Sequence, residues 1–171
     1  TYANMTPKKA IDLGIGMVHQ PFMLIEPLTV TENIILGYEE DTGLFLNRKK
    51  AREKIKDLTY EYGLDINPDS KIEDISVGQQ QRVEILKALY RGADVLIFDE
   101  PTAVLTPQEI KEFIDIVNRL TKMDKSIIII THKLSEIKAM ADYCTIIRRG
   151  KYIDKLKVCL LYTSPSPRDR Q

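Results

Sequence analysis

Two adjacent acids, Asp99 and Glu100, directly follow the apolar run 95–98. A short unbroken apolar run is typical of a parallel strand, and we expect this one to be buried on both faces. A carboxylate at the end of a buried strand is costly unless it is paired, solvated or bound to a cation. The pair could therefore bind Mg²⁺ and accept a proton, which are the two tasks that phosphoryl transfer requires.

Two further polar side chains stand at the ends of predicted strands. Gln20 ends the apolar segment 15–20, and Pro21 stops that strand because proline cannot donate a hydrogen bond to the sheet. His132 follows a second buried strand predicted over 126–131. In open α/β sheets, ligands bind at the carboxyl ends of the strands. We therefore expect one site that brings together Gln20, Asp99, Glu100 and His132.

Helix-capping patterns lie between the predicted strands. Ser76 and Gln79 form a capping box, as do Thr106 and Glu109, because a Ser or Thr is followed three residues later by Gln or Glu. Thr31 could cap another short helix. These caps and the apolar periodicity predict helices over residues 7–13, 32–36, 47–62, 77–91, 107–121 and 135–141.

Strands that alternate with helices predict an α/β fold with a mostly parallel sheet. The segment 21–92, between the first two strands, is expected to form a helical subdomain, and residues 21–72 look largely helical. Towards the end of the chain, segments 145–148 and 151–153 flank an Arg-Gly turn. This pattern predicts an antiparallel hairpin after the parallel strands.

The composition argues against several classes of protein, among them membrane-spanning and disulfide-stabilised proteins. The 171 residues include 25 basic and 25 acidic side chains, so no field of one sign favours nucleic acid or an anionic membrane surface. Apolar runs such as 127–130 are far shorter than the roughly 18 residues that a membrane helix needs. Cys144 and Cys159 show neither metal-ligand spacing nor a disulfide framework. These features fit a soluble protein in a reducing cytosol.

The last segment, residues 159–171, breaks the pattern with Ser-Pro repeats. It resembles translated read-through of a sequencing adaptor, so we expect it to be non-native and residues 1–158 to form the domain. A native disordered terminus rich in serine and proline is the alternative. Sequencing the parent gene across this junction would decide between them.

The chemistry-bearing residues also match known motifs. Residues 95–102 are similar to the Walker B motif of ABC ATPases, and residues 75–82 resemble the ABC signature motif that lies upstream of it. Gln20 resembles the Q-loop glutamine, and residues 130–132 resemble the H-loop. The four elements occur in the order that this family requires. Residues 11–158 therefore resemble part of an ABC ATPase domain, which implies a P-loop NTPase-like α/β fold, ATP and Mg²⁺.

The resemblance implies a role for each site residue. Asp99 would hold Mg²⁺, and Glu100 would orient and deprotonate the water that attacks the γ-phosphate. Gln20 would contact the metal or that water, and His132 would contact the γ-phosphate. Because the N-terminal end of a helix attracts anions, the signature would bind the ATP of an opposing ABC domain through Ser76, Val77, Gly78 and Gln79.

The phosphate-binding loop G-x-x-x-x-G-K-[ST], known as Walker A, does not occur in this sequence. The family places it, with an N-terminal β-subdomain, upstream of the Q-loop, so the chain looks like a fragment. We expect the chain by itself to bind ATP weakly and not to hydrolyse it. Val77 and Thr106 stand where the family usually has glycine and aspartate, which leaves the activity of each ATP site open.

Residues 17–20, 28–34 and 76–81 together look like importers of simple sugars and nucleosides. The altered signature resembles the N-terminal copy of two ABC domains in one polypeptide. This implies transmembrane permease subunits, an extracytoplasmic substrate-binding protein and a place at the cytoplasmic face of the inner membrane. The alternative is a non-transport ABC ATPase acting on ribosomes or nucleic acid. Against it, the span from Gln20 to Ser76 is too short for a long coiled-coil insertion, and no basic stripe is evident.

Overall fold

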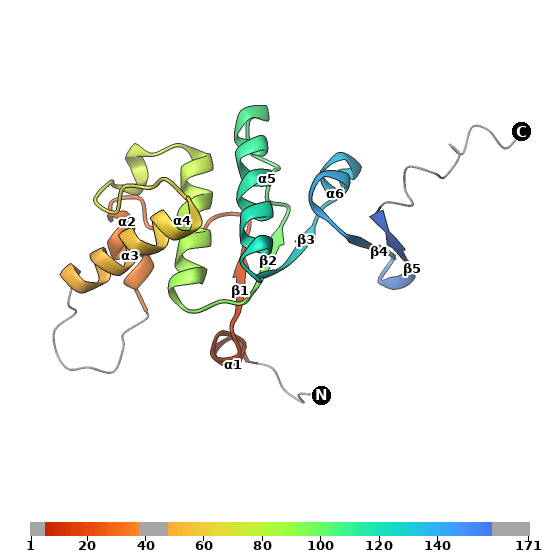
Figure 1. Ribbon diagram of the computed structural model, residues 1–171, viewed down its shortest axis with the longest axis horizontal. Helices are drawn as coiled ribbons and strands as arrows, with labels where there is room; N and C mark the ends of the chain where they lie inside the picture. Colours follow the sequence, from red (N-terminus) through yellow and green to blue (C-terminus); the bar gives the residue numbers. More distant parts are fainter. Residues whose placement is uncertain (1–5, 38–47, 159–171) are drawn as a thin grey trace, which may run out of the picture. The chain divides into compact units, whose positions relative to one another are not determined.

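The computed structural model describes residues 6–37 and 48–158 (Figure 1). The chain forms two compact units, Thr1–Ile130 and Thr131–Gln171. The sequence did not indicate this boundary, because the strand predicted over 126–131 and the histidine that follows it read as one segment. Each unit is therefore described by itself.

The first unit contains a sheet of three parallel strands in the order β1-β2-β3, with bounds β1 (Ile15–Val18), β2 (Val95–Asp99) and β3 (Ser126–Ile130). Val18 pairs with Phe98, and Phe98 pairs with Ile129. The carboxyl ends of the three strands therefore meet at one edge of the sheet. The predicted α/β fold with a parallel sheet is confirmed.

Helices fill the connections between these strands. The helices of the first unit are α1 (Pro7–Asp12), α2 (Val30–Ile35), α3 (Arg48–Tyr62), the 3-10 turn η1 (Ile72–Asp74), α4 (Val77–Tyr90) and α5 (Pro107–Lys122). Figure 1 shows α2, α3 and α4 gathered beside one another in the connection from β1 to β2. The predicted capping boxes at Ser76 and Thr106 are confirmed, because both side-chain bonds of each box are present.

Two local predictions for the segment after β1 are wrong. Thr29 caps α2 in place of Thr31, because Thr29 lies three residues before Glu32 and completes a capping box with it. Thr31 instead donates its hydroxyl to the carbonyl of Pro68, at 2.9 Å. The second wrong prediction is that residues 21–72 are largely helical. Residues 63–71 are not helical, and Lys71 forms a β-bridge with Thr29. The predicted start of α3 at residue 47 lies outside the described residues.

One face of the sheet forms the core of the first unit. Phe98 is fully buried, and its ring packs edge-on against Phe113 of α5, with ring centroids 5.3 Å apart. Gly16 lies on the same face of the sheet, where a Cβ atom would come within 2.8 Å of the Ala88 Cβ atom of α4. Helices α4 and α5 therefore cover this face, and the absence of a side chain at Gly16 lets α4 approach β1 closely.

The opposite face of the sheet is not buried. Met17, Ile128 and Ile130 are 40%, 50% and 49% exposed. Both the predicted burial of β2 on two faces and the predicted burial of β3 are therefore wrong for the described chain. An apolar run shows that a strand can be buried on two faces, but the elements that pack against it decide whether it is.

The second unit contains a helix and a hairpin, α6 (Leu134–Met140), β4 (Tyr143–Arg148) and β5 (Lys151–Lys157). The two strands pair antiparallel, and Arg149 and Gly150 form the turn with φ angles of 50° and 71°. The predicted hairpin is confirmed. In the described part of the chain, no helix has both the length and the apolar character needed to cross a bilayer. The Ser-Pro segment 159–171, with Cys159, lies outside the described residues.

Candidate functional site

The ends of β1 and β2 bring three of the predicted site residues to one edge of the sheet. Asp99 is the last residue of β2 and pairs with Ile130 of β3. Gln20 and Glu100 each lie two residues beyond the paired positions Val18 and Phe98. Parallel strands in register therefore place Gln20, Asp99 and Glu100 at the same edge of the sheet.

The backbone at Glu100 adopts an uncommon conformation. Its φ angle is 47°, in the left-handed region that non-glycine residues rarely occupy, and strained residues of this kind tend to cluster at functional sites as well as in turns. The Glu100 amide donates to the carbonyl of Ile130 at 2.9 Å, and its carbonyl accepts from the amide of Ala103 at 3.2 Å. These bonds fix the turn by which the chain leaves the sheet after the two acids.

Helix α4 holds the loop that follows the acids. Gln81 is 2% exposed and donates its side-chain amide to the carbonyl of Pro101 at 2.9 Å. The next residue, Thr102, is also buried. Gln81 is not among the predicted site residues, although a glutamine on the apolar side of a helix is a signal that its amide must find a partner.

The oxygen donors at this edge suit Mg²⁺. The Asp99 carboxylate and the Gln20 amide carbonyl are hard oxygen ligands of the kind that Mg²⁺ prefers. The described residues contain no group of three His, Cys, Asp or Glu side chains that could hold a metal ion. Mg²⁺ in nucleotide sites commonly takes one or two protein ligands, and phosphate oxygens and water complete its shell. The donor set therefore fits a metal that arrives with a nucleotide.

His132 belongs to the second unit, at the start of the segment that leads into α6. The residues on both sides of it are held by Glu136, which is 4% exposed. Thr131 donates its hydroxyl to Glu136 at 3.0 Å, and the Lys133 ammonium lies 3.2 Å from the same carboxylate. The position of His132 along its own segment is thus fixed, while its predicted role beside Asp99 and Glu100 stays a prediction.

Side chains of helix α4 also form hydrogen bonds with the segment that follows Gln20. The Met23 amide donates to the Glu84 carboxylate at 3.0 Å, and the Lys87 ammonium donates to the Met23 carbonyl at 3.2 Å. Glu84 is buried, and its carboxylate lies 3.8 Å from the Lys87 ammonium. The backbone of Met23 is thus bonded to α4 at both its amide and its carbonyl. Neither Glu84 nor Lys87 is among the predicted site residues.

The N-terminus of α4 carries the predicted nucleotide-binding residues Ser76, Val77, Gly78 and Gln79. The Ser76 hydroxyl donates to Glu109 Oε1 at 3.1 Å, and the Gly78 amide donates to the same oxygen at 3.0 Å. The Gln79 side chain turns back and accepts from the Ser76 amide at 3.0 Å. Val77, at 39% exposed, points its apolar side chain towards solvent. The two donors expected to meet a phosphate are therefore bonded to Glu109 of α5.

Glu109 is negatively charged at neutral pH. Its other oxygen, Oε2, accepts from the Thr106 amide at 2.9 Å and from the Thr106 hydroxyl at 2.8 Å. These bonds from Thr106, with smaller contributions from Gly78 and Ser76, hold the pKa of Glu109 below its ordinary value of 4.5. The sequence predicted the bonds to Thr106 but not the link to the N-terminus of α4.

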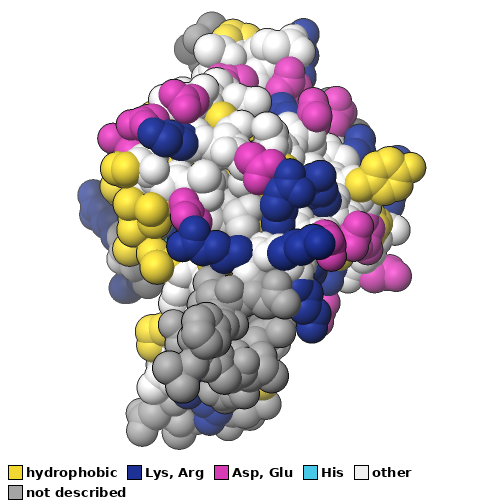
Figure 2. All heavy atoms as spheres, turned by 90° about the vertical axis from the view of Figure 1, so that its left-hand side faces the viewer, with side chains coloured by type: hydrophobic (Ala, Val, Ile, Leu, Met, Phe, Trp, Pro, Cys, Tyr) yellow, Lys and Arg dark blue, Asp and Glu magenta, His cyan; other side chains and the backbone are white. Residues whose placement is uncertain are grey.

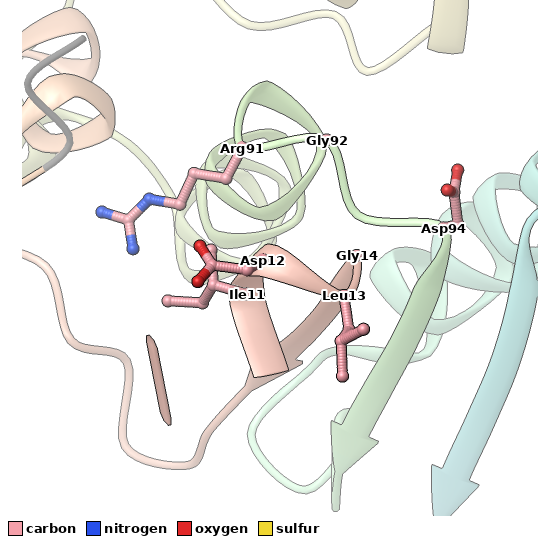
Figure 3. Close-up of a pocket in the computed structure, with 7 residues that line it drawn as sticks. All are labelled: Ile11, Asp12, Leu13, Gly14, Arg91, Gly92 and Asp94. Carbon is pink, nitrogen blue, oxygen red and sulfur yellow. The ribbon is translucent and has the colours of Figure 1, made fainter. Parts of the chain in front are cut away.

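A separate hollow of about 530 Å³ lies at the amino ends of β1 and β2, away from the candidate site. Figure 3 shows its lining, in which the carboxylates of Asp12 and Asp94 point in different directions. Asp94 pairs with Lys125 at 2.8 Å. None of the predicted site residues lines this hollow, and its acids are not arranged around a common point.

Charges of both signs mix on the surface of the first unit. Figure 2 shows Lys and Arg side chains interspersed with Asp and Glu side chains, and hydrophobic side chains gathered along one edge of the same view. Ion pairs such as Arg52 with Asp69 and Lys71 with Glu73 contribute to this pattern. This face therefore presents no field of one sign.

Comparisons with known proteins agree with the motifs. The family model described as "ABC transporter" matches residues 2–103. The chain is 63% identical over 153 residues to the nucleoside import ATP-binding protein NupA of Lactococcus lactis, covering 90% of this chain and 30% of that protein. It is 60% identical over 153 residues to the guanosine import ATP-binding protein NupO of Bacillus subtilis, with the same coverage of each. The chain thus spans about a third of the length of the curated relatives that it matches.

The fold is also similar to solved structures. The ADP conformation of MJ1267, an ATP-binding cassette of an ABC transporter, superposes with a TM-score of 0.78 at 22% identity. The match covers 95% of this chain and 69% of the MJ1267 chain. At this identity the likeness concerns the fold alone.

Proposed function

The chain belongs to the ABC transporter family, and on this premise we propose that it is part of an ATP-binding and ATP-hydrolysing subunit that powers an importer of nucleosides or simple sugars. The names of the relatives NupA and NupO, both import ATP-binding proteins, support this proposal. The observation that carries it is the register of β1 and β2, because Gln20, Asp99 and Glu100 share one edge of the sheet.

The chemistry we propose is attack of water on the γ-phosphate of ATP. Asp99 and Gln20 would supply oxygen ligands to Mg²⁺, which when bound neutralises charge on the phosphate oxygens. Glu100 would orient the water and take its proton on a carboxylate oxygen as the water oxygen bonds to phosphorus. The turn at Glu100, with its left-handed backbone, supports this role because it sets where the carboxylate emerges from the strand. His132 would contact the γ-phosphate.

The partners we propose include a second ABC domain, whose ATP would meet the N-terminus of α4. Ser76, Val77, Gly78 and Gln79 would be the residues that face it. The apolar Val77 side chain at this position would weaken a phosphate contact, because it adds bulk where close approach is needed. We therefore expect the site completed by this signature to be the weaker of the two.

Permease subunits would bind the segment that follows Gln20. Met23, Ile25 and Leu36 expose apolar side chains in this segment and in the adjoining residues of α2, which supports a protein contact there. Because Glu84 and Lys87 fix the Met23 backbone to α4, a movement at the nucleotide would reach this surface directly. We place the protein at the cytoplasmic face of the membrane, with an extracytoplasmic binding protein delivering the substrate to the permease.

Substitution of Glu100 tests this proposal in the complete protein that contains this chain. With its permease partners in proteoliposomes, Glu100→Gln is expected to reduce ATP hydrolysis by about 10²–10⁴-fold and to stop nucleoside uptake, because glutamine cannot accept the proton. ATP binding should remain. Glu53→Gln, an exposed acid on α3, is the matched control and should keep wild-type turnover.

Two results would contradict the proposal. Normal hydrolysis by Glu100→Gln would remove Glu100 from the reaction. Co-purification of the complete protein with ribosomes or nucleic acid, in the absence of permease subunits, would favour the alternative ABC ATPase that acts outside transport.

A further inference from the structure

We propose that Glu109 is an internal competitor for the anion site at the N-terminus of α4, so that a nucleotide phosphate can bind there only when this carboxylate is displaced. The inference rests on the proposed function, in which Ser76 and Gly78 face a phosphate. It concerns the regulation of that contact, and nothing in the motif itself indicates it.

The bonds made by Glu109 Oε1 carry the proposal. This oxygen accepts from the Gly78 amide at 3.0 Å and from the Ser76 hydroxyl at 3.1 Å. An amide and a hydroxyl at a helix N-terminus are the donors by which such a site binds a phosphate oxygen. The carboxylate oxygen therefore occupies the place of a phosphate oxygen and uses the same donors.

The space around Gly78 leads to the same conclusion. A Cβ atom at Gly78 would lie 2.6 Å from Glu109 Oε1 and 2.9 Å from both Cγ and Cδ of the same side chain. Glu109 thus packs directly against the Gly78 backbone on the side where a Cβ atom would lie. A phosphate that approached would also meet the negative charge of the carboxylate, which opposes binding.

Open space lies beside the Glu109 carboxylate. An open hollow of about 550 Å³ adjoins the contact. It is lined in part by Ser76, Gly78 and Glu109 and by charged side chains of both signs, namely Arg82, Arg119, Asp65, Glu112 and Asp115. Rotation of the Glu109 side chain into this hollow would free the Ser76 and Gly78 donors. The bonds to Thr106 hold the carboxylate back, so displacement requires that these bonds also break or rearrange.

The test titrates the 171-residue chain with inorganic pyrophosphate and follows the ¹⁵N-labelled amides of Ser76 and Gly78 by NMR. In Glu109→Gln, pyrophosphate is expected to bind at Gly78 at least about tenfold more tightly than in the unmodified chain, because a competing charge at hydrogen-bond distance is removed. Glu32→Gln is the matched control, since Glu32 makes the same capping-box bonds to Thr29 while its second oxygen pairs with Arg48 of α3. It should bind like the unmodified chain.

Equal affinity in the unmodified chain and in Glu109→Gln would overturn the proposal. So would the absence of binding in both, because the N-terminus of α4 would then be no anion site for Glu109 to occupy. If Glu109→Gln does not fold, the unmodified chain decides the question. High pyrophosphate must then shift the Gly78 amide and the ¹³Cδ resonance of Glu109 together, and a shift of Gly78 alone would contradict displacement.

This outcome is separable from the test of hydrolysis. The pyrophosphate titration follows the Gly78 amide of α4, whereas the turnover assay follows the role of Glu100, so the two tests report on different residues. A failure of displacement at Glu109 therefore leaves the hydrolytic role of Glu100 to the turnover assay, and the reverse also holds.

Discussion

Helices α2 and α5 begin with the same local motif and use it differently. Each has a threonine cap and a glutamate three residues later, and in each the glutamate Oε2 accepts from the amide and the hydroxyl of that threonine at 2.8–2.9 Å. In α2 the second oxygen of Glu32 pairs with Arg48, which is largely exposed. In α5 the second oxygen of Glu109 binds the N-terminus of another helix, at Ser76 and Gly78.

The difference shows that one sequence motif can bind different partners, an exposed arginine of α3 in one case and the donors at the N-terminus of α4 in the other. The Glu32 pair with Arg48 is of the exposed kind that contributes about 0–1 kcal/mol. Glu109 instead satisfies donors of α4 that would otherwise need water or a ligand. We therefore expect Glu109 to join the N-terminus of α4 to the start of α5, and Glu32 to add only an exposed ion pair to its own capping box.

The largest effect should come from Gly78→Ala. A methyl group at this position would press on Glu109 and force its carboxylate away from the Ser76 and Gly78 donors, and the loss of these hydrogen bonds should cost about 1–3 kcal/mol in the free energy of unfolding. The better helix propensity of alanine, about 1 kcal/mol, offsets only part of this cost. Urea unfolding of the two chains measures the difference.

A double-mutant cycle provides the control for Gly78→Ala. In a Glu109→Ala background the clash is gone, so the substitution should become neutral or stabilising. Val77→Ala, one residue earlier and already exposed, should change stability by no more than about 0.5 kcal/mol. An equal cost of Gly78→Ala in both backgrounds would show that Glu109 does not pack against Gly78.

A smaller effect distinguishes the two glutamates directly. Glu109→Gln should destabilise the chain by about 1–2 kcal/mol, because both oxygens accept from donors and the new amide group must face one pair of them. Glu32→Gln should cost about 0.5 kcal/mol or less, since glutamine is tolerated in a capping box and only the exposed pair with Arg48 is lost. Equal costs in urea unfolding would mean that the contact with α4 adds nothing to stability.

The sequence predicted those parts of the fold that depend on neighbouring residues. The caps at Ser76 and Thr106, the three parallel strands and the hairpin all follow from local spacing and apolar runs. The sequence does contain the signal for the true cap of α2, because Thr29, and not the predicted Thr31, stands three residues before Glu32. The exposure of Ile128 could not be predicted, since an isoleucine run reads the same whether one face or two are covered.

For the candidate site, too, the sequence predicted some features and not others. Strand topology alone was enough to bring Gln20, Asp99 and Glu100 to one edge, because parallel strands end together. The contacts that position them join residues far apart in the chain. Glu109 reaches Ser76 across 33 residues, and Glu84 reaches Met23 across 61. A single sequence contains no spacing rule for such pairs, so only the folded chain reveals them.

The smallest expected effect concerns pH. Hydrogen bonds from Thr106, and then from Gly78 and Ser76, lower the pKa of Glu109 in the folded chain below its ordinary value of 4.5. The charged form is therefore the one that stabilises the fold, so its contribution is complete above about pH 4.5 and is lost as the pH falls through the lower folded-state pKa.

The difference in unfolding free energy between the unmodified chain and Glu109→Gln should consequently shrink as the pH falls below about 4.5. Glu32 also has a lowered pKa, chiefly through Thr29, so the smaller difference for Glu32→Gln should shrink with the same sign. The two variants should then become alike in acid, because a protonated carboxyl resembles the amide that replaces it. Urea unfolding at stepped pH measures both differences, and a Glu109 difference that stays constant through this range would mean that shape, and not charge, joins α5 to α4.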